Sequence, residues 1–203
     1  MAIAVKTYPK LKKQPYLSVR QKLQSGDILL CSGSALLSKM IQKGTRSVWS
    51  HVGFIIRLDV IDRVMVLESV ESAGVRTVPL SHYVRDYKAT GQAYPGRVYV
   101  ARHRDFANKV NAKRMNKLSQ FAVDLFGYPY DKDEIVRITA RIGMALFGFK
   151  KSDVKRDREY ICSEYAWECY NAVGIRIPYN KSGFIAPADF AGDKGVRLIA
   201  RIV

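Results

Sequence analysis

Short apolar runs with the spacing of β-strands fill the first hundred residues of this chain, and helix-like patterns fill most of the second hundred. The runs are rich in Val, Ile and Leu and are bounded by Gly, Pro, Ser or Asp, which is typical of strands joined by tight turns. We expect strands over 28–31, 51–57, 63–69, 74–78, 97–101 and 196–202. Strands first and helices second, with one late strand closing the sheet, predict an α+β fold.

Helical periodicity predicts the remaining elements. We expect helices over 35–42, 111–126, 134–147 and 163–173, a helical turn over 81–87, and a turn-rich segment over 184–189. Asp133 is placed as the N-cap of the helix 134–147, and Gly174 as the stop of the helix 163–173. Between these two helices, residues 150–158 form a charged insertion.

The length of 203 residues predicts a single folded domain. Residues 1–24 are basic and contain Pro9 and Pro15, so we expect an N-terminal arm that ends in a short helix, followed by one domain over 25–203. No apolar run is long enough for a signal peptide or a membrane-spanning helix. Three cysteines without close pairs make a poor disulfide framework and favour a reducing, cytoplasmic compartment.

The charge balance predicts attraction to anionic partners. Lys and Arg number 34 against 18 for Asp and Glu, which gives a net charge of +16. A basic face of this kind suits nucleic acid, a phospholipid surface at which the protein binds peripherally, or an acidic polymer. A basic protein with no anionic partner is an equal alternative. There is no CxxC pair and no other convincing ligand set, so we expect neither a metal nor a cofactor.

Cys162 is the candidate for chemistry, because it lies in the first turn of an expected helix. Unpaired N–H groups at a helix N-terminus favour the thiolate, which is the reactive form of cysteine. Cys169 lies seven residues further along the same helix and is expected to be inert core. Taken alone, Cys162 would also fit a buried structural cysteine.

His51 is the best candidate base for such a nucleophile, because it opens an apolar strand that would hold its ring. His82 and His103 are expected to be ordinary surface or core residues. If the strands around His51 and Glu68 form a hairpin, an even loop puts both side chains on one face. A two-residue turn at Asp59-Val60 would place them directly opposite, and a four-residue loop would make them diagonal neighbours. Glu68 could then orient His51; otherwise it is a surface glutamate.

Five short motifs occur together in this sequence. They are Ser25-Gly26-Asp27-Ile28-Leu29-Leu30, Ser50-His51-Val52-Gly53, Leu67-Glu68-Ser69, Gly127-Tyr128-Pro129-Tyr130-Asp131 and Tyr160-Ile161-Cys162-Ser163-Glu164. In this order, over residues 24 to 190, they resemble the circularly permuted NlpC/P60 group of papain-like cysteine hydrolases, in its YiiX/YebB-like branch. The resemblance implies an antiparallel, partly barrel-like sheet packed on helices. It also implies a nucleophile at Cys162, a general base at His51 and a third polar residue at Glu68. Tyr130 matches a tyrosine that positions substrate or lines the oxyanion pocket.

The resulting hypothesis is a cysteine hydrolase that cleaves an amide or ester bond through a thioester on Cys162. Its substrate would be a small molecule, a peptide or an acyl compound. Thioesterase and acyltransferase activities are variants of the same chemistry. The high charge, the insertion over 150–158 and the lack of an export signal argue against cleavage of peptidoglycan outside the cell. One rival is a lipid-directed acyl hydrolase or acyltransferase whose apolar segment 138–149 faces a membrane. A second is a basic nucleic-acid-binding module without catalysis. A third is a family member that has lost its activity.

Overall fold

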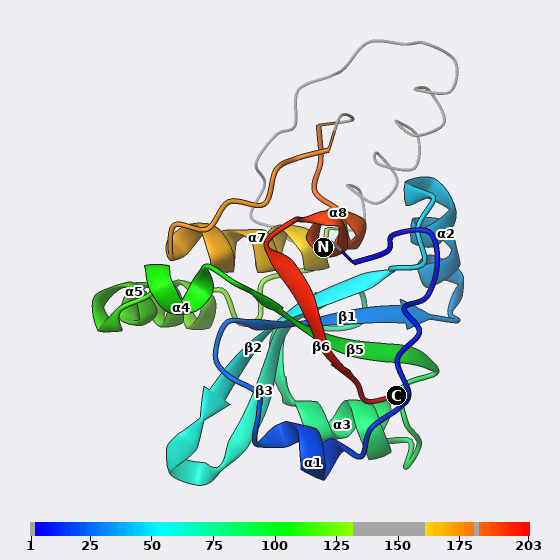
Figure 1. Ribbon diagram of the computed structural model, residues 1–203, viewed down its shortest axis with the longest axis horizontal. Coiled ribbons are helices and arrows are strands. Elements are labelled where there is room, and N and C mark those ends of the chain that lie inside the picture. Colours follow the sequence, from blue (N-terminus) through cyan, green and yellow to red (C-terminus); the bar gives the residue numbers. More distant parts are fainter. Residues whose placement is uncertain (1–2, 132–160, 181–182) are drawn as a thin grey trace.

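The computed structural model describes residues 3–131, 161–180 and 183–203 (Figure 1). The described strands form one antiparallel sheet in the order β4-β3-β2-β1-β5-β6. They are β1 (Asp27–Gly33), β2 (His51–Leu58), β3 (Arg63–Val70), β4 (Gly74–Pro79), β5 (Gly96–His103) and β6 (Val196–Arg201). Every expected strand is present, and the α+β class with an antiparallel sheet is confirmed. β4 and β6 are the two edges of the pairing order, so a partly barrel-like shape stays a prediction.

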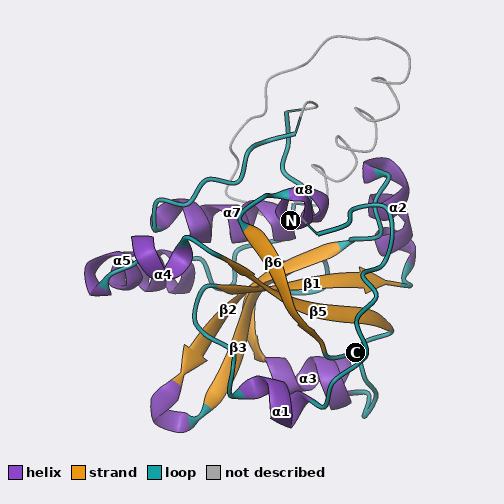
Figure 2. Ribbon diagram, viewed as in Figure 1, coloured by secondary structure: helices purple, strands orange, loops and turns teal. Residues whose placement is uncertain are grey.

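Helices cover both faces of this sheet (Figure 2). They are α1 (Tyr16–Arg20), α2 (Leu36–Thr45), α3 (Leu80–Arg85), α4 (Phe106–Lys109), α5 (Ala112–Asp124), α7 (Cys162–Ala172) and α8 (Pro187–Gly192), with 3-10 turns η1 (Asp59–Ile61) and η2 (Tyr87–Ala89). The expected helix 134–147, its cap Asp133, the apolar segment 138–149 and the charged insertion 150–158 lie outside the described residues. Within the described residues, no helix has the length and apolar character needed to cross a membrane.

α8 refines one expectation, because residues 184–189 were expected to be rich in turns and a helix begins among them. The helix begins at Pro187, whose fixed φ and missing N–H suit the first helical position. Asp189 accepts a hydrogen bond from the backbone N–H of Ala186 at 2.7 Å, which caps the helix start. A proline that usually signals a break therefore starts a short helix here.

The alternation of side chains along the strands builds two separate cores. On one face, Ile28, Leu30 and Phe54 pack with residues of α7, including Tyr165 and Tyr170. On the other face, Leu29, Ile55, Val66 and Val100 pack with Val19 of α1 and with Leu80 and Tyr83 of α3. β1 is buried along its whole length, which explains the continuous apolar run from Ile28 to Cys31.

The N-terminal segment packs against the domain. The backbone N–H of Ile3 donates to the carbonyl of Ala191 at 3.0 Å, and Lys13 pairs with Arg201 of β6 through an isolated parallel bridge. Val19 of α1 and Leu23, which follows this helix, are buried in the core. The domain boundary at residue 24 remains a prediction, because these contacts do not show whether residues 25–203 fold alone.

The Gly26-Asp27 turn joins both halves of the chain at the start of β1. The N–H of Gly26 donates to the carbonyl of Ile55 at 2.9 Å, and its carbonyl accepts the Tyr170 hydroxyl at 2.8 Å. The buried carboxylate of Asp27 accepts two hydrogen bonds from Arg102, at 2.6 and 2.9 Å. The turn therefore links β1 to β2, β5 and α7.

Replacing Gly26 with alanine should destabilise the protein strongly, because the residue has φ +93° and an added Cβ would lie 2.3 Å from the Phe106 ring. We expect a loss of about 3 kcal/mol, which combines left-handed backbone strain with overpacking. Gly91→Ala is the matched control, since Gly91 also has positive φ but has no atom within 4 Å of the added Cβ. This substitution should lower the free energy of unfolding by about 1 kcal/mol. Denaturant unfolding measures both, and equal losses would contradict the packing argument.

Candidate active site

Cys162 is the first residue of α7 and is almost completely buried. Ile161 precedes it in an extended conformation, and the Glu164 carboxylate accepts the Ile161 N–H at 3.3 Å. Hydroxyl groups fix the rest of the first turn: Ser163 donates to the carbonyl of Ile185 at 2.8 Å, and Tyr165 to that of Ala122 at 2.9 Å. The thiol therefore lies at the N-terminal end of a helix whose position is set by several neighbouring elements.

His51 is held at the start of β2. The preceding residue, Ser50, donates its backbone N–H to the carbonyl of Cys31 at 2.8 Å and accepts the Gly33 N–H on its hydroxyl at 2.9 Å. The Nε2 atom of His51 lies 2.8 Å from Oε2 of Glu68, and its side chain is only 13% exposed. The ring is thus fixed by β2 on one side and by the carboxylate on the other.

The β2–β3 hairpin explains why His51 and Glu68 meet. Leu58 pairs with Arg63, so the connection has four residues, and Phe54 pairs with Leu67 further along. Continuing this register places Gly53 opposite Glu68 and makes His51 its diagonal neighbour on the same face. This confirms the expectation for a four-residue loop and excludes the two-residue turn at Asp59-Val60. Gly53 has no side chain to fill the space between the two partners.

Glu68 is completely buried and has His51, Arg76 and Tyr83 as hydrogen-bonding partners. Its Oε1 accepts hydrogen bonds from Nε and Nη2 of Arg76 at 3.0 and 2.8 Å, and its Oε2 accepts a short hydrogen bond from the Tyr83 hydroxyl. Arg76 is its cross-strand neighbour in β4. Sequence reasoning missed both residues. The β3–β4 register could have revealed Arg76, whereas Tyr83 comes from α3 and carries no local signal.

This environment separates the protonation states of the carboxyl and the imidazole. Burial alone would raise the pKa of Glu68, but hydrogen bonding and charge from His51, together with Arg76 and Tyr83, lower this pKa below its ordinary value. Burial disfavours the charged form of His51, yet the negative charge of Cys162 and hydrogen bonds to Cys162 and Glu68 raise the pKa of His51 to about 10. The arrangement therefore stabilises a charged imidazolium between the Glu68 carboxylate and the Cys162 sulfur.

Cys162, His51 and Tyr130 line one cavity of about 120 Å³. Ser50, Ser69 and Tyr94 contribute to its polar wall, and Leu37 and Ile41 of α2 to its apolar wall. Tyr130 is buried, and burial followed by the charge of Cys162 raises the pKa of its phenol well above the ordinary value. A phenol that keeps its proton can donate a hydrogen bond into the cavity. The structure thus brings together the residues that the sequence selected from distant positions.

The other cysteines and histidines lie in different settings. Cys31 and Cys169 are fully buried, and burial raises the pKa of each thiol. His82 is exposed. His103 is buried, accepts the Asp105 N–H at 3.2 Å and lies 3.5 Å from Asp193, and burial lowers its pKa. Only His51, of the three histidines, lines the cavity beside Cys162.

Comparisons with known proteins identify the family of this chain. A family model described as "Permuted papain-like amidase enzyme, YaeF/YiiX, C92 family" matches residues 22–183. The YiiX protein of Escherichia coli strain K12 is 31% identical over 155 residues, which cover 76% of this chain and 61% of that protein. The match therefore spans about three fifths of the length of this relative. The permuted papain-like family and the YiiX likeness that the motifs predicted are confirmed, but the matching model is a different branch from NlpC/P60.

A solved structure supports the fold alone. The crystal structure of a metalloprotein YiiX from Escherichia coli O157:H7 superposes with a TM-score of 0.58 at 23% identity, covering 88% of this chain and 97% of that one. "Metalloprotein" describes that protein. In the ranges 3–131, 161–180 and 183–203, no group of three or more His, Cys, Asp or Glu residues is arranged to hold a metal ion.

The raised pKa of His51 predicts that its imidazolium persists far above neutral pH. Its protonated form should be lost only as pH rises through about 10, which the ring nitrogen shifts in NMR spectra will report. Cys162→Ser removes the sulfur that raises the pKa of His51 and should move this titration to lower pH, while Cys169→Ser should leave it unchanged. A His51 ring that is already neutral in mildly alkaline buffer would contradict the ion pair.

Proposed function

This chain belongs to the family of permuted papain-like amidases typified by YaeF and YiiX, and from that premise we propose that it is a cysteine hydrolase that cleaves an amide or ester bond through a thioester on Cys162. One observation carries the proposal: an imidazole bound to a buried carboxylate shares a cavity with a thiol at a helix N-terminus. A nucleophile, a base and a group that orients the base are the parts that such chemistry requires.

In the first step, the Cys162 thiolate attacks the substrate carbonyl carbon, forming a C–S bond while the carbonyl π electrons move to oxygen. The developing oxyanion needs hydrogen-bond donors. The backbone N–H of Cys162 is one candidate, since the first N–H groups of a helix have no partner within the helix. The Tyr130 hydroxyl is the second, because it lines the same cavity and remains protonated.

His51 then moves two protons. As the imidazolium it protonates the departing amine or alcohol when the carbonyl re-forms and the C–N or C–O bond breaks, leaving a thioester on Cys162. As the neutral imidazole it takes a proton from water, whose oxygen attacks the thioester and releases the acid and the thiolate. Glu68 accepts the hydrogen bond from Nε2 throughout, so the Nδ1 atom is left to serve as the acid and base.

Hydrolysis is favoured because the family consists of amidases. An amine or alcohol in place of water would make the same site an acyltransferase, and a thioester substrate would make it a thioesterase. A third alternative substrate is a lipid-linked acyl group, which the protein would meet at a membrane surface. The nucleic-acid alternative has less support, because a binding module has no need of a buried carboxylate–imidazole pair beside a thiol. An inactive family member has less support for the same reason.

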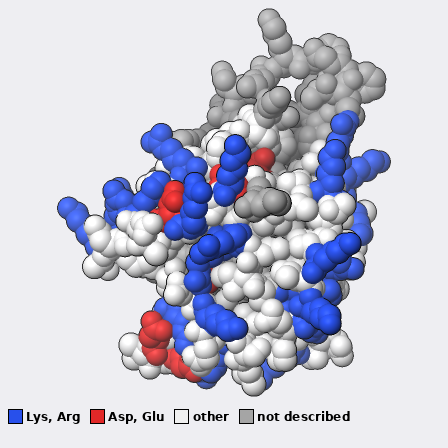
Figure 3. Space-filling model, in the orientation of Figure 1, with Lys and Arg blue, Asp and Glu red and all other residues white. Residues whose placement is uncertain are grey.

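The basic surface remains a candidate contact for an anionic substrate carrier. Lys and Arg side chains are spread across several elements of the face in Figure 3, with few Asp and Glu between them. This distribution suits attraction to a lipid or nucleic-acid surface through charge rather than through one shaped groove. We propose a cytoplasmic protein that can associate peripherally with membranes through these side chains.

Substituting the nucleophile tests the function. Cys162→Ala should lower the hydrolysis of an activated nitrophenyl ester, or of a confirmed amide substrate, by about a thousandfold or more. Glu68→Gln should retain the fold and lose about tenfold or more in kcat, since it leaves His51 without its anionic partner.

Cys169→Ala is the matched control, because it removes a buried thiol from the same helix without touching the cavity. It should keep the rate within about twofold after correction for the folded fraction, as no group in the transition state is lost. Full activity of folded Cys162→Ala would overturn the proposal.

A further inference from the structure

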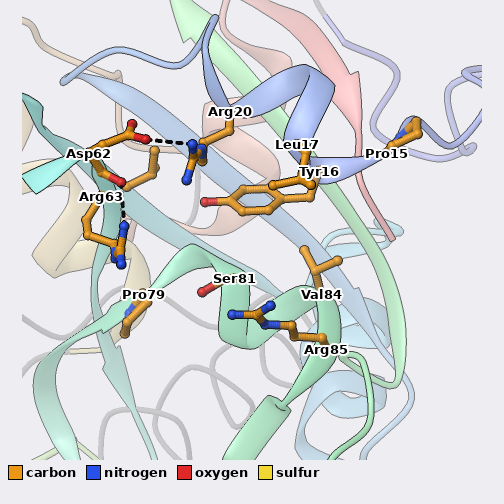
Figure 4. A pocket seen from close by; sticks show the side chains of 11 residues that line it. Pro15, Tyr16, Leu17, Arg20, Asp62, Arg63, Pro79, Ser81, Val84 and Arg85 are labelled. Carbon is orange, nitrogen blue, oxygen red and sulfur yellow. Dashed lines mark hydrogen bonds and ion pairs between the residues drawn. The ribbon is translucent and has the colours of Figure 1, made fainter.

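A second cavity, of about 430 Å³, lies between α1 and α3 (Figure 4). α1 and α3 pack on the core opposite α7, so this cavity is separate from the one that holds Cys162. Tyr16, Pro15, Pro79 and Val84 give it mainly apolar walls, and Leu17 at its rim is 71% exposed. A volume of this size falls in the range of sites for small organic ligands.

The charged residues of this cavity leave positive charge uncompensated. The carboxylate of Asp62 is shared between Arg20 and Arg57, each at 2.6 Å. Among the described residues, Arg63 donates only to the backbone carbonyls of Ile61 and Asp62. For Arg85, the described part of the chain offers neither a hydrogen bond nor an ion pair. Asp62 is the one carboxylate among the residues that line the cavity, and it is bound to Arg20 and Arg57 rather than to Arg63 or Arg85.

The apolar walls of this cavity and the positive charge of its arginines together indicate which class of ligand it could bind. The Tyr16 ring and the two prolines offer flat apolar surfaces, which suit an aromatic ring better than a flexible chain. Guanidinium groups bind carboxylates and sulfonates through paired N–H donors and also stack on aromatic faces. The Ser81 hydroxyl, which lines the same cavity from α3, can add one hydrogen bond. We propose that this cavity is a binding site for an aromatic organic anion, with Arg85 as its principal charged contact and Arg63 as the second.

Anilinonaphthalene sulfonate is a suitable probe, because it is an aromatic anion whose fluorescence rises in apolar surroundings. We expect saturable binding to the folded protein, weakened about tenfold by Arg85→Gln, which removes one charge-assisted hydrogen bond. Val84→Trp should abolish this binding by filling the cavity. Naphthoate should displace the probe, whereas neutral naphthalenemethanol should displace it at least tenfold less well and inorganic sulfate alone should not.

Arg104→Gln is the control for loss of one positive charge, since Arg104 is exposed and lies outside the cavity. It should leave probe affinity unchanged. The assignment would be overturned if the wild-type protein and Arg85→Gln bound the probe with equal affinity, or if both arginine variants weakened binding equally. It would also be overturned if naphthalenemethanol displaced the probe as strongly as naphthoate. Arg85 is exposed, so its substitution should not prevent folding. Neither Cys162 nor His51 lines this cavity, so failure here would leave the hydrolase proposal intact.

Discussion

The buried carboxylate of Glu68 holds the candidate site together. A carboxylate removed from water is costly unless charged or hydrogen-bonded partners replace the solvent. Here the partners come from three other elements: His51 of β2, Arg76 of β4 and Tyr83 of α3. Because all of them must be in place to compensate one charge, the position of the imidazole depends on the correct pairing of β2, β3 and β4 and on the packing of α3.

The second requirement is that α7 places its first turn beside the start of β2. Buried Tyr165 and Tyr170 anchor the helix against the sheet, and Tyr170 reaches the Gly26 turn that begins β1. The contact between Tyr170 and Gly26 joins residues 144 positions apart. In the permuted order the histidine strand comes first and the cysteine helix late, so the two halves of the site meet only when the sheet and helices have assembled. The same contacts therefore stabilise the fold and set the geometry of the site.

Much of this arrangement could be predicted from the sequence where the signals are local. The strands are visible because apolar residues alternate or run between turn residues, and Cys162 is visible because the helix pattern begins beside it. The meeting of His51 and Glu68 followed from strand periodicity once the loop length was allowed to vary. Arg76 depends on a second register, that of β3 with β4, which pairs it with Glu68. Tyr83, the start of α8 at Pro187 and the cavity beneath α1 depend on tertiary packing, which leaves no trace in short sequence patterns.

The most direct test of the site needs no substrate. Iodoacetamide at neutral pH, followed by peptide mapping, compares the three thiols in one sample. If the Cys162 sulfur is paired with the His51 imidazolium at an accessible cavity, it should be alkylated well before Cys31 and Cys169, and His51→Ala should slow this reaction selectively. Alkylation of Cys31 or Cys169 at the same rate as Cys162, or a Cys162 rate unaffected by loss of His51, would contradict the account.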